Sequence, residues 1–399
     1  MLRPPGRTRY PRAARMSDIE PFHVMELLAR AKVLEAQGRS VIHMEIGEPD
    51  FPTPRRICEA GMRALEHGEL YYTAALGLPA LRHAVSGFYR TRYGGDVAPE
   101  RIVITSGSSA ALLLALGVLV DPGSEVLVTD PGYPANRHFV RMLNGVPVQV
   151  PVGADSNYQM TPEALAQHWS ERTVAALVAT PSNPAGTLIP SAHIARMAAL
   201  TAERGGVLIV DEIYHGLVYE GETRTALEAA DDVFVINSFS KYFNMTGWRL
   251  GWMVAPEAYV RDLDKLAQNV YLSAPAPAQY AALAAFEPET LAVLDARREE
   301  FRARRDYLVP ALRALGFDIP QTPQGAFYIY AGCARLTGDS FRFSLDLLEQ
   351  AGVAVAPGVD FGAHRAAAHV RFAYTNSLER LREGVARIAG FLNDTARAP

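Results

Sequence analysis

A lysine flanked by two serines, with an arginine shortly after it, is the part of this sequence best suited to chemistry. Ser238-Phe239-Ser240-Lys241 follows an apolar run, and Arg249 comes eight residues after the lysine. A lysine amine can condense with an aldehyde, and hydroxyl and guanidinium groups bind phosphate, the guanidinium in a bidentate manner. The tetrapeptide alone also fits a solvated surface lysine. Together with the arginine it suits a phosphorylated aldehyde, and this is the chemistry of pyridoxal phosphate.

Gly107-Ser108-Ser109 lies between an apolar strand-like run and an apolar helix-like run. Backbone amides and hydroxyls at the N-terminus of a helix bind anions. The same residues also suit plain helix capping. Ser108 and Ser109 are therefore candidate ligands of an anion.

Two further motifs follow predicted strands. In Asp130-Pro131-Gly132-Tyr133-Pro134 the tyrosine is placed to stack on a planar ligand, although the motif in isolation favours a turn with a packed aromatic ring. In Thr180–Thr187, written TPSNPAGT, prolines on both sides of Asn183 make a rigid loop that aims one amide. That amide can donate to a phenolate oxygen, and the alternative is a multi-proline turn.

An acidic residue follows the apolar predicted strand Val207–Val210. Asp211 needs a partner if it is buried, and a pyridinium nitrogen is a suitable one. Tyr214, three residues on, can donate to the ring hydroxyl oxygen of the same ligand. A helix-capping acid or a metal ligand are the alternatives, but the chain contains no Gly-x-x-x-x-Gly-Lys-[Ser/Thr] loop, which disfavours nucleotide hydrolysis.

Arg371 lies between apolar neighbours in Val370-Arg371-Phe372-Ala373. A buried arginine requires an anionic partner. A substrate carboxylate and an internal ion pair both satisfy that requirement.

The elements that must position these residues alternate between strand and helix patterns from about residue 100. Continuous apolar strands separated by helices predict a mostly parallel sheet covered by helices on both faces, with functional groups at the strand ends. After about residue 288 the pattern changes to a smaller α+β unit. We predict a tail over 1–20 that is disordered, a joining segment over 21–45, a large ligand-binding domain over 46–287 and a small domain over 288–399.

Composition excludes several classes of function. With 399 residues and a net charge of −4, the chain offers no electrostatic argument for binding nucleic acid. No apolar run is long enough to span a membrane, and the two cysteines, Cys58 and Cys333, have no metal-type spacing. We therefore assign no metal ligands and expect a cytoplasmic location. Five arginines and three prolines precede Met16, which is a possible start of translation.

Taken together, the motifs resemble the class I/II aminotransferases of pyridoxal phosphate fold type I. The resemblance runs in order from about Pro21 to the C-terminus and includes Ile46–Phe51, Tyr71-Tyr72-Thr73 and Gly77–Arg82. It implies that pyridoxal 5'-phosphate is the cofactor and that a homodimer shares its active sites. The implied roles are: Lys241 as the cofactor-linked lysine and proton carrier; Asp211 as the partner of the ring nitrogen; Asn183 and Tyr214 as donors to the ring oxygen; Tyr133 as the stacking ring; Ser108, Ser109, Ser238, Ser240 and Arg249 as phosphate ligands; Tyr72 as a phosphate ligand of the neighbouring subunit; Arg371 as the clamp on the substrate carboxylate; and Gly47 as a backbone contact to the substrate.

The resemblance further implies an aminotransferase that moves an amino group from an L-amino acid to a 2-oxo acid by a ping-pong mechanism. We expect a broad range of neutral or aromatic donors, with 2-oxoglutarate or pyruvate as acceptor. Tyr71, Tyr158 and Tyr271 suit such donors, with packing in the core as the alternative. Arg137 and His138 are candidates for binding a second carboxylate, with a solvent-facing or structural position as the alternative. A carbon–sulfur β-lyase and an aspartate-specific aminotransferase are the alternatives. A regulator of transcription on this fold would need a winged-helix domain, for which the residues before Pro21 are too few.

Overall fold

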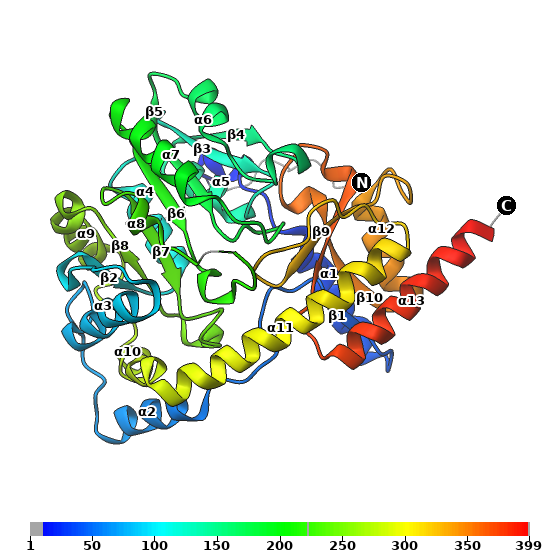
Figure 1. The fold of residues 1–399 in the computed structure, drawn as a ribbon, viewed down its shortest axis with the longest axis horizontal. Helices are drawn as coiled ribbons and strands as arrows, with labels where there is room; N and C mark the ends of the chain where they lie inside the picture. The colour runs from blue at the N-terminus through cyan, green and yellow to red at the C-terminus, as the bar shows by residue number, and fades with distance from the viewer. Residues whose placement is uncertain (1–10, 222, 398–399) are drawn as a thin grey trace.

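The computed structural model describes residues 11–221 and 223–397, which form two sheets surrounded by helices (Figure 1). In the larger sheet β8 is antiparallel to both of its neighbours, and the other neighbouring pairs are parallel. The predicted mostly parallel sheet is thereby confirmed. Its strands, in spatial order, are β2 (Ile102–Thr105), β8 (Gly251–Val254), β7 (Phe234–Ser238), β6 (Val207–Asp211), β5 (Thr173–Ala179), β3 (Glu125–Asp130) and β4 (Val146–Pro151).

Both faces of the larger sheet are buried because its strands are apolar at consecutive positions. Along β3, Val126 and Val128 pack in one hydrophobic cluster, whereas Leu127 packs in another on the opposite face. The first cluster contains residues of α4 (Ser108–Gly117) and α9 (Glu257–Val270). The second contains residues of α3 (Pro79–Tyr93), α6 (Pro162–His168), α7 (Ser191–Glu203) and α10 (Ala276–Leu283). Helices therefore cover both faces, as predicted.

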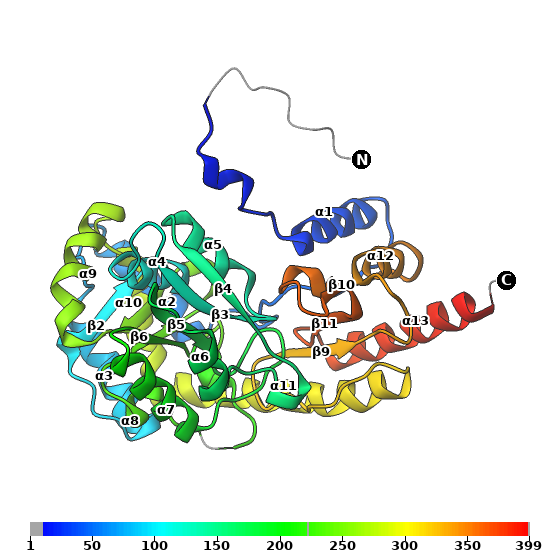
Figure 2. The same cartoon turned by 90° about the horizontal axis from the view of Figure 1, so that it is seen from above.

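A second, smaller sheet lies beside the first (Figures 1 and 2). It pairs β1 with β10 in parallel and β10 with β11 and β11 with β9 in antiparallel fashion. Its strands, in spatial order, are β1 (Ile42–Met44), β10 (Val353–Pro357), β11 (His369–Ala373) and β9 (Tyr328–Gly332). The remaining α-helices of the described residues are α1 (His23–Ala36), α2 (Arg55–Glu66), α5 (Pro134–Met142), α8 (Ala226–Ala229), α11 (Pro288–Ala314), α12 (Ser340–Asp346) and α13 (Leu378–Arg397).

The direction of the strands explains where the functional residues gather. Strands β2, β3, β5, β6 and β7 all run the same way, so their carboxyl ends meet at one edge of the sheet. Five of the motifs identified in the sequence lie at or directly after these strand ends. The motif residues are Ser108 after β2, Tyr133 after β3, Asn183 after β5, Asp211 at the end of β6 and Lys241 after β7.

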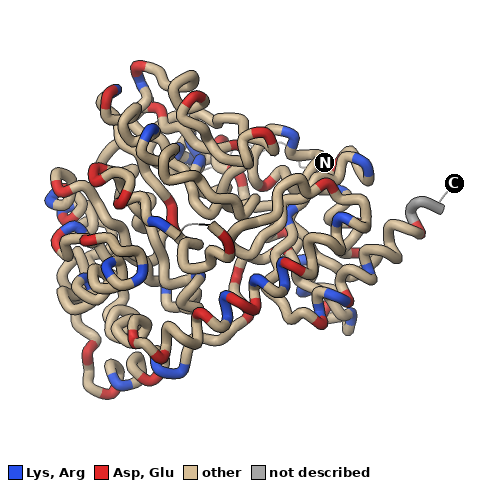
Figure 3. Tube along the Cα trace, in the orientation of Figure 1, with Lys and Arg blue, Asp and Glu red and all other residues tan. Residues whose placement is uncertain are grey.

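Acidic and basic residues lie among one another along the described chain (Figure 3). No described helix is both long and apolar enough to cross a membrane. Residues 1–10 of the predicted tail lie outside the described residues, and Ala14–Ser17 form a short 3-10 helix. The boundaries proposed for the two domains stay a prediction.

Candidate active site

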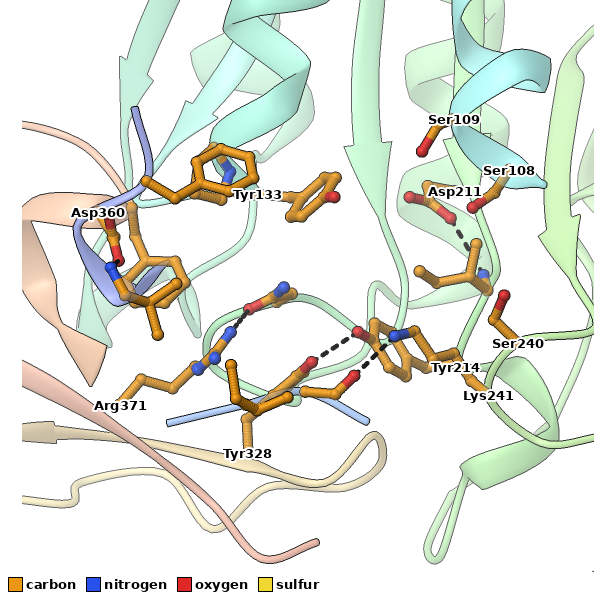
Figure 4. A pocket seen from close by; sticks show the side chains of 18 of the residues that line it. Ser108, Ser109, Tyr133, Asp211, Tyr214, Ser240, Lys241, Tyr328, Asp360 and Arg371 are labelled. Carbon is orange, nitrogen blue, oxygen red and sulfur yellow. Dashed lines mark hydrogen bonds between the residues drawn. The ribbon is translucent and has the colours of Figure 1, made fainter. Parts of the chain in front are cut away.

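A cavity of about 240 Å³ opens between the edge of the larger sheet and the smaller sheet. Arg371 and Asp360 lie on one side of it in Figure 4, and Ser108, Ser109 and Asp211 lie on the other. Eleven of the predicted site residues line this one cavity: Gly47, Ser108, Ser109, Tyr133, Asn183, Asp211, Tyr214, Ser240, Lys241, Arg249 and Arg371.

Lys241 reaches into the cavity from the loop after β7. Its Nζ donates a 2.7 Å hydrogen bond to the carbonyl oxygen of Gly47. Burial, with a further contribution from the nearby Arg371, lowers the pKa of the Lys241 amine to about 8. An amine with that pKa is a competent nucleophile and proton carrier near neutral pH.

Asp211 ends β6 with its side chain almost fully buried. The backbone amide of Ile213 donates to Oδ1 at 3.1 Å, which orients the carboxyl group. Burial raises the pKa of Asp211 to about 7, an effect that this amide and the Lys241 charge partly oppose. A cation placed beside Asp211 in the cavity would stabilise its charged form.

Arg249 and the N-terminus of α4 form a cradle for an anion. Gly107 precedes the helix with φ of 82°, and a Cβ there would lie 2.8 Å from Nη2 of Arg249. Glycine is therefore needed for the guanidinium to approach the first turn of the helix. Ser108 and Ser109, in that first turn, line the cavity together with Ser240. Helix amides, hydroxyls and a guanidinium together suit a phosphate.

Arg371 comes from the smaller sheet and is buried. Its Nη1 donates to Oδ1 of Asn183 at 3.0 Å, and its Nη2 donates to the carbonyl oxygen of Glu45 at 2.5 Å. Both acceptors are neutral, Nε has no hydrogen-bond partner among the described residues, and no described carboxylate forms an ion pair with this arginine. The sequence predicts that Arg371 pairs either with a substrate carboxylate or with an internal carboxylate. The described residues contain no such internal ion pair, and the substrate carboxylate stays a prediction.

Aromatic side chains complete the walls of the cavity. Tyr133 lies just before α5, and burial raises the pKa of its hydroxyl. The hydroxyl of Tyr214 is 2.9 Å from the hydroxyl of Tyr328 on β9. The Nζ of Lys241 lies 5.9 Å from the centre of the Tyr214 ring.

Two predicted residues lie elsewhere. Ser238 does not line the cavity: its buried Oγ accepts a 3.0 Å hydrogen bond from the amide of Ser240 and thereby holds the loop that carries Lys241. Tyr72 is 81% exposed and does not line the cavity of its own chain. Their roles as phosphate ligands stay predictions.

Neither candidate for binding a second carboxylate reaches the cavity. Arg137 donates to the carbonyl oxygen of Asp360 at 3.3 Å from both Nη atoms and lies 3.8 Å from Glu20. His138 is buried away from the cavity, and burial lowers its pKa.

Several cavity residues carry no chemical signature that would single them out in the sequence. Asp360 follows β10, and its carboxylate accepts hydrogen bonds from the amides of His23 (2.6 Å) and Val24 (2.8 Å) at the start of α1. That contact joins segments more than 300 residues apart. The other cavity residues that the motifs did not predict include Phe22, Thr246, Tyr328 and Phe361.

The family model described as aminotransferase class I and II matches residues 39–388. The (5-formylfuran-3-yl)methyl phosphate transaminase of Methanocaldococcus jannaschii is 38% identical over 382 residues, which cover 95% of this chain and 99% of that protein. The valine–pyruvate aminotransferase of Mycobacterium tuberculosis is 36% identical over 383 residues, which cover 96% of this chain and 98% of that protein.

Solved structures agree. The crystal structure of an aminotransferase from Mycobacterium tuberculosis superposes with a TM-score of 0.93 at 36% sequence identity. The superposition covers 96% of this chain and all of that chain.

Proposed function

The chain belongs to the class I and II aminotransferases, and from that premise we propose that it transfers the amino group of a neutral or aromatic L-amino acid to a 2-oxo acid with pyridoxal 5'-phosphate as cofactor. One observation carries the proposal. The buried Arg371 guanidinium, without a carboxylate partner among the described residues, lines the same cavity as the Lys241 amine. A substrate with a carboxylate next to an amine would bind Arg371 through its carboxylate and place its amine on the Lys241 side of the cavity.

The residues of the cavity fit pyridoxal phosphate. The cradle of Ser108, Ser109, Ser240 and Arg249 suits its phosphate. The buried carboxyl group of Asp211, whose pKa burial raises to about 7, suits a protonated ring nitrogen, since that cation would restore its charged form. Lys241 supplies the amine that an aldehyde requires.

The proposed mechanism divides the work between the two sides of the cavity. Arg371 binds the substrate carboxylate and so fixes the orientation of Cα. When bound, pyridoxal phosphate supplies a ring that delocalises the electron pair left on Cα as its proton leaves. Lys241 accepts that proton, for which its lowered pKa of about 8 is suited. It would then deliver the proton to the cofactor carbon that takes up the amino group. The Asp211 carboxylate would keep the ring nitrogen of the bound cofactor protonated.

The acceptor reaction uses the same groups in reverse order. A 2-oxo acid also carries a carboxylate for Arg371, so donor and acceptor occupy one site in turn. This arrangement predicts ping-pong kinetics. Pyruvate and 2-oxoglutarate are the proposed acceptors.

The preference for neutral or aromatic donors rests on the walls near Arg371. Phe22, Val24, Ile46 and Phe361 line the cavity, and the ring centre of Phe361 lies 4.8 Å from the guanidinium carbon of Arg371. Among the described residues, the cations that line the cavity are Lys241, Arg249 and Arg371. Within the described part of one chain, Arg137 does not supply a further cation for a distal carboxylate, because it is engaged with Asp360 and Glu20. One relative's name, valine–pyruvate aminotransferase, pairs a neutral donor with pyruvate. The β-lyase alternative is not favoured, since the relatives are aminotransferases.

A donor panel tests this proposal. We expect the purified protein with pyridoxal phosphate to convert alanine, valine and phenylalanine with either acceptor, and Arg371→Ala to raise donor KM by roughly a hundredfold. Arg137→Ala is the matched control and should leave KM for neutral donors unchanged. Strict use of aspartate with loss of activity in Arg137→Ala would contradict the donor class. Pyruvate and ammonia from cystathionine without an acceptor would instead indicate a lyase.

We also propose a homodimer in which Tyr72 reaches the phosphate of the neighbouring site. Exposed apolar side chains around Tyr72 support a surface that a second subunit covers. Leu70, Tyr71 and Tyr72 are exposed on one loop. The amide of Thr73 in this loop donates to Oγ of Ser273, which follows the exposed Leu272. We expect sedimentation to show a dimer, and Tyr72→Ala to weaken cofactor binding although Tyr72 lies outside the cavity of its own chain. A monomer with full affinity for the cofactor would contradict the proposal.

A further inference from the structure

Tyr328 contacts both sides of the cavity at once. Its hydroxyl is 2.9 Å from the hydroxyl of Tyr214, on the cofactor side. Its ring centre lies 4.1 Å from the guanidinium carbon of Arg371, on the substrate side, and Tyr328 is 2% exposed (Figure 4). The sequence motifs do not single out Tyr328, because it is one of several aromatic residues in the strand-like run Ala326–Tyr330.

The surrounding backbone holds the Tyr328 hydroxyl in place. A Cβ on Gly47 would lie 1.8 Å from that oxygen, so the glycine backbone closes directly against it. The carbonyl oxygen of Gly47 in turn accepts the hydrogen bond from Lys241. The hydroxyl thus lies between the Tyr214 hydroxyl and the segment that also binds the lysine, with little freedom to rotate away.

The ring of Tyr328 meets a cation that forms no ion pair with a described carboxylate. Arg371 makes its hydrogen bonds to neutral oxygens of Asn183 and Glu45, and its guanidinium carbon also lies 4.8 Å from the ring centre of Phe361. The electron-rich face of an aromatic ring stabilises a desolvated guanidinium and restricts its orientation. The two rings therefore hold the cation without neutralising it, which leaves its charge for a carboxylate.

We propose that Tyr328 is a positioning residue with two separable functions. Its hydroxyl donates to the Tyr214 oxygen, so that the single Tyr214 proton points into the cavity toward the cofactor ring oxygen. Its ring holds Arg371 in the orientation that binds the substrate carboxylate. This inference rests on the proposed function, and it adds a residue that acts through its neighbours on both the cofactor and the substrate.

Two variants separate the functions. Tyr328→Phe keeps the ring and removes the hydroxyl, whereas Tyr328→Leu removes both. Tyr330→Phe is the matched control: Tyr330 lies two residues further along β9 on the same face, and its buried hydroxyl has no hydrogen-bond partner among the described residues. Each variant is loaded with pyridoxal phosphate and compared with the loaded wild type.

The first measurement is the pH titration of the absorption spectrum of the bound cofactor. Without the Tyr328 hydroxyl, Tyr214 is a poorer donor to the ring oxygen, so the more negative form of the chromophore is less stable. We expect Tyr328→Phe to raise the apparent pKa of the chromophore by roughly half a pH unit or more, and Tyr330→Phe to leave it unchanged.

The second measurement is calorimetric binding of 3-phenylpropanoate, an unreactive carboxylic acid. We expect Tyr328→Phe to retain the wild-type Kd, and Tyr328→Leu to weaken binding by roughly tenfold. Unchanged spectra in Tyr328→Phe, or equal Kd values in the Phe and Leu variants, would overturn the inference while the aminotransferase assignment stands. A wild-type protein that does not bind pyridoxal phosphate at Lys241 would overturn both.

Discussion

The amide oxygen of Asn183 accepts a 3.0 Å hydrogen bond from Nη1 of Arg371, joining a loop of the larger sheet to a strand of the smaller one. Because the oxygen of this amide is engaged by the arginine, its NH₂ group is the part left to face a ligand. The side chain proposed to donate to the cofactor and the side chain proposed to bind the substrate are therefore directly linked.

This contact predicts the effect of Asn183→Asp. The new carboxylate would lie within hydrogen-bond distance of Arg371 and would form an ion pair with a cation that otherwise awaits the substrate. We expect KM for amino-acid donors to rise by at least about tenfold relative to Asn183→Ala. The alanine variant is the control, since it removes the amide donor without adding charge. Equal KM values for the two variants would show that Arg371 is not available to bind a carboxylate.

Asp211 predicts a pH dependence of stability in the cofactor-free protein. Burial raises its pKa to about 7 in the folded state, whereas the unfolded chain releases the proton near pH 4. The stability contributed by this proton is therefore complete below pH 4 and is lost as the pH rises through 7. Asp211→Asn removes this linkage.

Urea unfolding at pH 5 and pH 7 measures the effect. Between these values we expect the wild type to lose on the order of 2 to 3 kcal/mol of unfolding free energy relative to Asp211→Asn. Asp232→Asn, at an exposed aspartate, is the control and should follow the wild type. Parallel curves for wild type and Asp211→Asn would contradict the proposed burial of a protonated acid.

Gly107→Ala should weaken cofactor binding through the Arg249 guanidinium. The added Cβ would lie 2.8 Å from Nη2, so the guanidinium must move out of the anion cradle. Gly123→Ala is a matched control, because Gly123 has a similar φ of 85° but no described atom within 4 Å of the new Cβ. Both variants carry backbone strain of about 1 kcal/mol. We expect only Gly107→Ala to raise the Kd for pyridoxal phosphate, by roughly tenfold, as measured by fluorescence titration.

Lys241→Ala should lower kcat by at least about a hundredfold. The variant should still bind pyridoxal phosphate, without a covalent bond. Borohydride treatment followed by mass spectrometry of the peptide is the measurement, with a stable adduct expected at Lys241 of the wild type and none in the variant. Lys265→Ala, at an exposed lysine, should behave as wild type. An adduct at another lysine of the wild type would show that Lys241 is not the residue that carries the cofactor.

Much of the fold follows from local patterns. Strands such as Val207–Asp211 are apolar at consecutive positions and are bounded by glycine, proline and polar residues, so their buried sheet is evident in the sequence. A threonine directly before a proline is typical of the start of a helix, and the Oγ1 of Thr161 accepts a hydrogen bond from the amide of Ala164 at 3.1 Å. What the pattern did not indicate is that β8 runs antiparallel, because an apolar strand carries no mark of its direction.

The sequence by itself determined which side chains at the strand ends can do chemistry. The type of each group (amine, acid, amide or hydroxyl) and its position after a predicted strand are enough to identify it as a candidate. Only the tertiary structure decided which of them share a cavity. It turned Ser238 onto the Ser240 amide and Arg137 toward Asp360, and it placed Tyr328 against both Tyr214 and Arg371. Apart from the local contact between Ser238 and Ser240, these contacts join segments that are distant in the chain. The packing of the two sheets, rather than any local periodicity, sets the distances between those segments.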